Sequence, residues 1–214
     1  MEKYQVFQQL TDSGIVAVMR KMTPEKVVSI VSGLKAAGIN AVEITVENKE
    51  GLRAIQTVKK HFKSEILLGA GTILDGETAK EAINAGVDFI VTPVVSKSAI
   101  DVAKRYGCFI GVGAMTPTEI LNAYEAGADL VKIFPADNLG PSYLKNVKGP
   151  LGHIPLMPTG GINVSNIGDY VRSGAVCVGV GGALYKYETE EEITAAASQF
   201  VEVFQRAKMS ISTL

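Results

Sequence analysis

Four short phrases, each a small residue followed by glycine, recur along the chain and constrain its fold more than any other feature. Their glycines are Gly38, Gly86, Gly127 and Gly174. Each phrase ends a stretch with helical periodicity and is followed, after two to four residues, by an apolar run. Because glycine accepts the left-handed backbone that commonly ends a helix, each phrase predicts a helix-to-strand turn. The glycines lie 48, 41 and 47 residues apart, about two strand–helix units each time.

Between these phrases, apolar β-branched runs alternate with longer amphipathic segments. The predicted strands are Ile15–Met19, Ala41–Thr45, Ile66–Ala70, Phe89–Thr92, Phe109–Gly113, Leu130–Phe134, Leu156–Pro158 and Val176–Gly179. The clearest predicted helices are Pro24–Ala37, Glu77–Ala85, Thr118–Ala126 and Glu190–Lys208, with an additional one at Glu2–Leu10. Eight strands that each lead into a helix suit a closed parallel barrel better than an open doubly wound sheet. The sequence therefore predicts one α/β domain over residues 1–214, a (β/α)8 TIM barrel with an additional N-terminal helix.

The composition limits the classes of function. A formal net charge of -1 and the lack of a basic run argue against a nucleic-acid binder. No stretch approaches the length of a membrane span and the N-terminus lacks an apolar signal core, so we expect no membrane partner and a cytoplasmic location. Cys108 and Cys177 stand in separate apolar stretches, which predicts buried thiols rather than a disulfide.

Two charged residues, Lys132 and Glu43, stand inside predicted strands. Side chains along a strand alternate between its two faces. The apolar neighbours of Lys132 are expected to face the outer helices, so Lys132 points into the barrel, and the same reasoning turns Glu43 inward. Active sites of such barrels lie at the C-terminal ends of the strands. These two residues are therefore candidates for chemistry.

A lysine in an apolar interior has its charged form disfavoured, which leaves more free amine. A free amine attacks a ketone carbonyl and gives an iminium, an electron sink for breaking the adjacent carbon–carbon bond. A neighbouring carboxylate can move the protons that this reaction requires. Lys132 and Glu43 thus fit the nucleophile and the general acid/base of a Schiff-base aldolase. A buried ion pair that only stabilises the barrel explains the pattern equally well at this point.

A metal-dependent mechanism has little support in the sequence. Its two histidines, His61 and His153, do not fall at the C-terminal end of a predicted strand, and no cluster has zinc-ligand spacing. We therefore expect neither a metal nor another cofactor.

Two glycine clusters follow the last two predicted strands. Gly160 and Gly161 follow one of them, and Gly181 and Gly182 follow the other. Loops at this place in a (β/α)8 barrel commonly hold a phosphate through backbone N–H groups, which glycine allows to approach closely. Two clusters favour a phosphate site over tight turns alone.

Four further residues at strand ends are candidates for binding the rest of a substrate. Arg20 can form a bidentate fork with a carboxylate or a phosphate, and Thr72 can donate to a carboxylate. Pro93 and Phe134, the latter followed by proline, can shape the walls of a pocket. Each of these residues also has an explanation that involves no ligand. Arg20 can be a solvated arginine, Thr72 a threonine that caps a turn, and the prolines can simply end the strands and begin the loops.

Six motifs occur in order between about Ile15 and Leu184. They are Val42-Glu43-Ile44-Thr45, Gly69-Ala70-Gly71-Thr72, Val91-Thr92-Pro93, Gly113-Ala114-Met115-Thr116-Pro117-Thr118-Glu119, Val131-Lys132-Ile133-Phe134-Pro135 and Pro158-Thr159-Gly160-Gly161-Ile162. With this set the chain resembles the 2-keto-3-deoxy-6-phosphogluconate (KDPG) aldolase family, many of whose members also cleave 4-hydroxy-2-oxoglutarate (KHG).

The resemblance implies a metal-independent class I aldolase, usually a homotrimer, that splits a phosphorylated 2-keto-3-deoxy sugar acid into pyruvate and glyceraldehyde 3-phosphate. It implies that Lys132 is the Schiff-base lysine and Glu43 the general acid/base. The positions that match pocket residues around the pyruvate unit are Thr72, Pro93, Phe134 and Thr159. The positions that match phosphate-binding loops are Gly160, Gly161, Gly181 and Gly182, and Arg20 matches an arginine that several members carry.

The chain departs from the family pattern at two positions. Glu47 stands where some members have an arginine for the substrate carboxylate, so Arg20 or Thr72 must bind that group or the substrate differs. Gly182 stands where many members have a phosphate-contacting serine. Residue types do not separate the gluconate substrate from its galactonate epimer or from KHG. Two other classes also stay open: a phosphate-binding isomerase or synthase with Lys132 as a clamp, and a non-catalytic sugar-phosphate-binding regulator.

Overall fold

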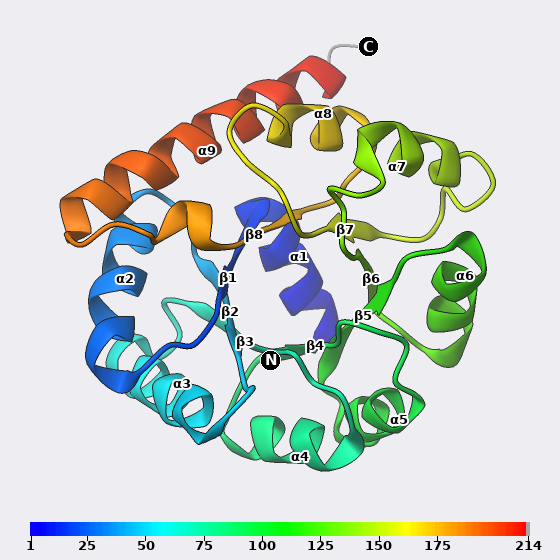
Figure 1. The fold of residues 1–214 in the computed structure, drawn as a ribbon. Coiled ribbons are helices and arrows are strands. Elements are labelled where there is room, and N and C mark those ends of the chain that lie inside the picture. Colours follow the sequence, from blue (N-terminus) through cyan, green and yellow to red (C-terminus); the bar gives the residue numbers. More distant parts are fainter. Residues whose placement is uncertain (213–214) are drawn as a thin grey trace.

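A computed structural model describes residues 1–212, in which eight parallel strands form a central ring and helices surround it (Figure 1). The strands are β1 Ile15–Met19, β2 Ala41–Thr45, β3 Leu67–Gly71, β4 Phe89–Val91, β5 Phe109–Ala114, β6 Leu130–Ile133, β7 Leu156–Pro158 and β8 Val178–Val180. The α-helices are α1 Lys3–Ser13, α2 Pro24–Ala36, α3 Lys49–Phe62, α4 Gly76–Asn84, α5 Lys97–Tyr106, α6 Pro117–Ala126, α7 Gly140–Lys148, α8 Ile167–Arg172 and α9 Glu190–Ser212, and a short 3-10 helix, η1, spans Gly182–Leu184. The prediction of a (β/α)8 TIM barrel with an additional N-terminal helix is confirmed.

The strands are hydrogen-bonded in the order β7-β6-β5-β4-β3-β2-β1-β8. A single parallel bridge between Thr159 and Gly179 joins the two ends of this sheet. The ring is therefore nearly closed, and it brings the loops after β7 and β8 next to the end of β1. This closure decides which residues meet at the C-terminal end of the barrel.

The repeated glycines end helices as expected. All four have a left-handed backbone, with φ values of 91° at Gly38, 87° at Gly86, 110° at Gly127 and 97° at Gly174. Helix α6 begins at Pro117, one residue before the predicted Thr118, and Thr116 and Glu119 form a reciprocal capping box at its start. Local residue chemistry thus sets the turns between helices and strands.

Two apolar layers pack against the strands. The outward side chains of β2 and β6, Val42, Ile44, Val131 and Ile133, belong to the layer between the strands and the outer helices. A second cluster, inside the ring, contains the large side chains of Phe89, Phe109, Leu130 and Met157. The residues between these outward positions, Glu43 and Lys132, therefore face the interior, as the alternation along the strands predicts.

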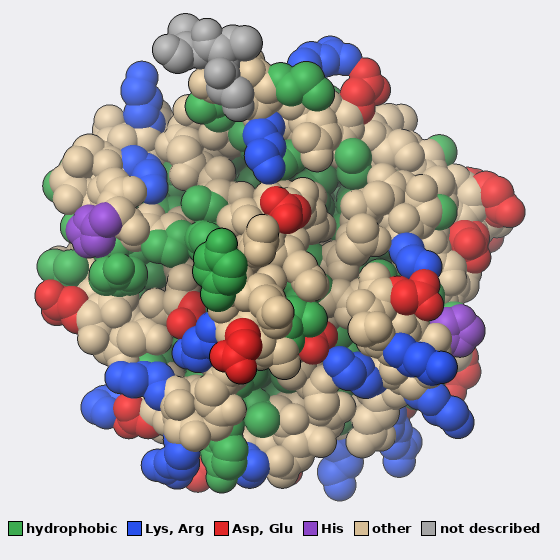
Figure 2. Space-filling view, turned by 180° about the vertical axis from the view of Figure 1, so that it is seen from behind, with side chains coloured by type: hydrophobic (Ala, Val, Ile, Leu, Met, Phe, Trp, Pro, Cys, Tyr) green, Lys and Arg blue, Asp and Glu red, His purple; other side chains and the backbone are tan. Residues whose placement is uncertain are grey.

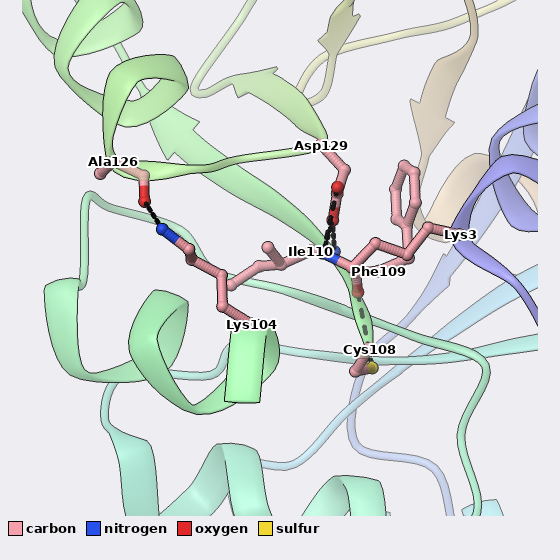
Figure 3. A network of polar contacts seen from close by, with 7 residues as sticks. All are labelled: Lys3, Lys104, Cys108, Phe109, Ile110, Ala126 and Asp129. Atoms are coloured by element: carbon pink, nitrogen blue, oxygen red, sulfur yellow. Dashed lines mark hydrogen bonds and ion pairs between the residues drawn. The ribbon is translucent and has the colours of Figure 1, made fainter. Parts of the chain in front are cut away.

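Helix α1 packs against the interior cluster with Val6 and Leu10. Figure 3 shows how its first turn is held: Lys3 Nζ lies 2.8 Å from Asp129 Oδ2, and this carboxylate also accepts the N–H of Ile110 at 2.9 Å. Asp129 precedes β6 and Ile110 lies near the start of β5, so α1 lies over the N-terminal end of the barrel.

Both cysteines are buried and free of a disulfide, as predicted. Burial raises the pKa of the Cys108 thiol to about 11 and that of Cys177 to about 12. Neither thiol therefore ionises near neutral pH.

Element boundaries differ from prediction by one to a few residues. Strand β8 begins at Val178 rather than at Val176, because pairing with β1 starts where Val178 lies beside Ile15. Helix α9 continues to Ser212, beyond the predicted end at Lys208. Strand pairing and helix packing set these limits, and a single segment does not carry that information.

Charged side chains of both signs are interspersed on the face of the barrel shown in Figure 2, without a large block of one sign. Among the described residues, no helix combines the length and the apolar character that crossing a membrane requires.

Candidate active site

Lys132 on β6 and Glu43 on β2 meet inside the barrel. Lys132 Nζ lies 3.6 Å from Glu43 Oε1. The two residues are 4% and 0% exposed. The ammonium group also lies 5.2 Å from the ring centre of Phe134. An amine and a carboxylate from distant segments thus form a close buried pair at the C-terminal half of their strands.

The carboxylate of Glu43 has no hydrogen-bond partner for either oxygen among residues 1–212. A separation of 3.6 Å from Lys132 Nζ is too long for a strong hydrogen bond. A buried carboxylate is costly unless its oxygens are satisfied. Glu43 therefore has free capacity to bind or move a proton on a group that enters beside Lys132.

Gly71, the last residue of β3, makes the space that Glu43 occupies. A Cβ atom at this position would lie 2.0 Å from Glu43 Oε1 and 2.7 Å from its Cγ. The absence of a side chain at Gly71 is thus a requirement of the Glu43 position, whereas Gly69 in the same strand makes room for the ring of Phe89.

A cavity of about 630 Å³ has Lys132 of this pair in its lining. Its lining comes from the ends of β1, β6, β7 and β8 and from the loops that follow them. Eight of the residues proposed from the sequence lie in it: Arg20, Lys132, Phe134, Thr159, Gly160, Gly161, Gly181 and Gly182. The cavity has the size of a small-molecule site.

Thr159 lies at the base of the cavity and is 5% exposed. Its hydroxyl oxygen has no hydrogen-bond partner in the described part of the chain. Gly179 of β8 leaves room for this side chain, because a Cβ there would lie 2.2 Å from Thr159 Oγ1. A buried hydroxyl without a partner is available to a ligand.

The glycines after β7 and β8 form one end of the cavity. Gly160 and Gly161 have φ values of 101° and 68°, a conformation that other residues rarely adopt. Gly182 has open space beside its Cα, because a Cβ added there would meet no atom within 4 Å beyond its chain neighbours. Asp137, which follows β6, borders this end, since its Oδ2 would lie 2.9 Å from a Cβ added to Gly161. The backbone is thus accessible at the place predicted for a phosphate.

Arg20 follows β1 at the mouth of the cavity, and its side chain is 54% exposed. Its Nη1 lies 3.7 Å from Glu47 Oε1, so the acid that departs from the family pattern is a neighbour of this arginine. The backbone N–H of Arg20 donates to the hydroxyl of Tyr185 at 3.0 Å.

Thr72 and Pro93 do not line this cavity with the other candidates. Thr72 directly follows Gly71 and has a φ of 60°, which is uncommon for a residue other than glycine. Pro93 packs against β5, because a Cβ on Gly113 would lie 2.2 Å from the Pro93 carbonyl carbon. Both belong to the β3–β4 side of the barrel mouth.

Three lining residues with polar side chains were not among the sequence candidates: Asp137, Asn163 and Tyr185. Asp137 and Asn163 lie two or three residues beyond strand-end residues that were proposed, so a wider window after each strand includes them. Tyr185 follows η1, and no signal in the sequence connects it with Arg20.

Within residues 1–212, no group of three His, Cys, Asp or Glu side chains is placed to hold a metal ion. The histidines lie among aromatic residues elsewhere: His61 packs on Phe62, and His153 packs on Tyr124.

The family signature described as KDPG and KHG aldolase matches residues 6–199. The chain belongs to this family. A 2-dehydro-3-deoxy-6-phosphogalactonate aldolase from Escherichia coli is 32% identical to it over 94% of this chain and 98% of that one. A 2-dehydro-3-deoxy-phosphogluconate aldolase from Pseudomonas aeruginosa is 34% identical over 72% of this chain and 70% of that one. A solved structure described as native KDPGal is 31% identical, with a TM-score of 0.86 over 91% of this chain and 96% of that one.

This KDPG and KHG aldolase family member is therefore an aldolase, an enzyme of the lyase class. Membership in an aldolase family decides against the isomerase or synthase and against the non-catalytic regulator that the sequence left open. The relatives carry names for both epimeric substrates, so the exact sugar acid is a separate question.

Proposed function

We propose that the enzyme is a class I aldolase in which Lys132 forms a Schiff base with a 2-keto acid and Glu43 transfers the protons. The observation that carries this proposal is the buried pair itself, with Lys132 Nζ 3.6 Å from a Glu43 carboxylate that has no other partner among the described residues. A buried ion pair with a purely structural role is usually completed by further hydrogen bonds, and Glu43 has none within residues 1–212.

The chemistry follows from these two groups. The free amine of Lys132 adds to the C2 carbonyl of the keto acid, and the carbinolamine loses water, with a proton supplied by the Glu43 carboxyl group. The Glu43 carboxylate then takes the proton of the C4 hydroxyl while the C3–C4 bond breaks. The electron pair of that bond enters the iminium and gives the enamine of pyruvate, and the aldehyde leaves. Protonation of the enamine at C3 and addition of water return pyruvate and the free lysine.

We propose 2-dehydro-3-deoxy-6-phosphogluconate as the substrate, cleaved to pyruvate and glyceraldehyde 3-phosphate. The cavity supports this choice, because it extends from Lys132 to accessible backbone at Gly160, Gly161, Gly181 and Gly182. Backbone N–H groups at such loops bind phosphate oxygens. The unpartnered hydroxyl of Thr159 lies between these two ends and is suited to a substrate hydroxyl.

Two further substrates belong to the same proposal. The galactonate epimer is the second candidate, because the Escherichia coli relative is named for it. KHG is a shorter, unphosphorylated candidate that would use only the Lys132 end of the cavity.

Pyruvate release from the three acids, measured with lactate dehydrogenase, tests this function. We expect the gluconate phosphate to have the highest kcat/KM, full activity after treatment with a chelator, and no activity in Lys132→Met. A metal-dependent loss of activity would contradict the class I assignment. Faster cleavage of the galactonate epimer would overturn the substrate choice alone.

We also propose that the enzyme acts as a homotrimer, as its family resemblance implies, through an apolar patch on three neighbouring loops. The patch consists of Leu74, Val94, Val95 and Met115, which are 57%, 53%, 38% and 37% exposed. These residues follow β3, β4 and β5, and Ser96 Oγ donates to the Leu74 carbonyl to join two of the loops. Exposed apolar side chains on neighbouring loops favour burial against another copy. The molar mass of the wild type and of Val94→Asp, measured by light scattering, tests this. We expect the wild type to be a trimer and Val94→Asp to be dissociated. The control is Tyr4→Ser, at the opposite end of the barrel, which should leave the trimer intact. A monomeric wild type would contradict the proposal.

A further inference from the structure

Tyr185 connects two strand ends that together border the cavity. Its hydroxyl donates to the carbonyl of Val18 at 3.0 Å and accepts the backbone N–H of Arg20, also at 3.0 Å. Val18 and Arg20 flank the C-terminal end of β1, whereas Tyr185 directly follows η1 in the loop after β8. One hydroxyl thus holds the backbone on both sides of the residue that ends β1.

The tyrosine is also part of the cavity wall, together with Arg20, Gly181 and Gly182. Burial raises the pKa of the phenol, although the hydrogen bond from the Arg20 N–H and the charge of Arg20 act in the opposite direction. The hydroxyl therefore stays protonated near neutral pH, so it donates to the Val18 carbonyl and at the same time accepts the N–H of Arg20. Phenylalanine at this position would leave the Arg20 N–H and the Val18 carbonyl without this partner.

The side chain of Arg20 is held only weakly, so the place of its guanidinium depends on how firmly the backbone of Arg20 is held by Tyr185. The guanidinium is more than half exposed, and its ion pair with Glu47 spans 3.7 Å, a distance at which exposed pairs contribute little. The described contacts of Arg20 therefore fix its backbone through Tyr185 more firmly than its side chain through Glu47.

We propose that Tyr185 is a positioning residue, which holds Arg20 beside the glycine loops so that the guanidinium binds the phosphate of the substrate, the charged group that lies farthest from Lys132. The inference rests on the proposed aldolase function, and it assigns to Arg20 the far end rather than the pyruvate carboxylate.

Steady-state kinetics of Tyr185→Phe with the phosphorylated acid and with KHG test the proposal. We expect KM for the phosphorylated acid to rise about 3- to 10-fold, the size of one hydrogen bond's net contribution, with a much smaller change in kcat. The ratio of kcat/KM values for the two acids should fall by the same factor, because KHG has no phosphate. Inorganic phosphate should also inhibit the variant less strongly, and this measurement does not depend on the chemical step.

A double-mutant cycle with Arg20→Ala separates positioning from a general effect on the fold. If Tyr185 acts through Arg20, Tyr185→Phe should change KM little once the guanidinium is absent. Tyr143→Phe is the matched control, since it removes a hydroxyl that donates to the Met115 carbonyl on another loop of the same barrel end. Additive effects in the cycle, an unchanged ratio of kcat/KM values, or an equal loss in Tyr143→Phe would overturn the inference. Failure of the wild-type enzyme to release pyruvate from either acid would instead contradict the proposed function.

Discussion

Substituting alanine at Gly71 tests whether the position of the Glu43 carboxylate is needed for turnover. The new Cβ would lie 2.0 Å from Glu43 Oε1, whereas ordinary van der Waals contact begins at 3.4 Å. The carboxylate must therefore move by more than about 1 Å, and a misplacement of that size can reduce turnover roughly 100-fold. Because Glu43 is fully buried, the crowding should also lower the free energy of unfolding by about 1–3 kcal/mol.

The assay compares kcat for pyruvate release and the free energy of unfolding in denaturant for two glycine variants. Gly111→Ala is the matched control, because this interior β5 residue has its nearest neighbour, Val91 Cγ2, at 3.6 Å from a Cβ. We expect Gly111→Ala to keep wild-type turnover and Gly71→Ala to lose about 100-fold. A Gly71→Ala enzyme that is destabilised but turns over at the wild-type rate would refute the role of Glu43, since the carboxylate would have moved without consequence.

Three further predictions concern the same cavity and the core. Glu43→Gln keeps the shape of the side chain but cannot exchange protons, so kcat should fall about 100- to 10,000-fold, and near-normal turnover would exclude proton transfer by this residue. Thr159→Val removes a hydroxyl that has no partner among the described residues, so the melting temperature should stay unchanged and kcat/KM should fall. A lower melting temperature with unchanged kcat/KM would instead indicate a structural role. Burial raises the pKa of Cys108 to about 11 and of Cys177 to about 12, so almost no thiolate forms in the native enzyme at about pH 8 and reaction with a disulfide reagent should be very slow. Both thiols should react completely once the enzyme is unfolded, and rapid labelling of the folded enzyme would contradict this.

The fold was predictable because its signals are local. The repeated glycines and the alternation of periodicity each depend on a few neighbouring residues. Strand parity was equally local, and together with the predicted barrel it placed Lys132 and Glu43 on the inner face.

The arrangement of the cavity was predictable only in part, because it depends on contacts between strands far apart in the sequence. The contact between Tyr185 and Arg20 exists only because ring closure puts β8 beside β1, so no local pattern indicates it. In the sequence, Glu47 departs from the family pattern without an evident reason. The structure shows that it lies beside Arg20, a contact that the sequence does not indicate. Thr72 and Pro93 follow strands as predicted, yet the wall of the cavity lies on the side of β1, β6, β7 and β8.

The most direct test of the central claim is to trap the covalent intermediate on the wild-type enzyme. The protein would be incubated with pyruvate, reduced with borohydride, digested and mapped by mass spectrometry, with Lys132→Met treated in parallel. We predict one pyruvyl adduct, on Lys132, with loss of aldolase activity in proportion to labelling and no adduct in the variant. Full activity after this treatment, or an adduct on a different lysine, would contradict the account.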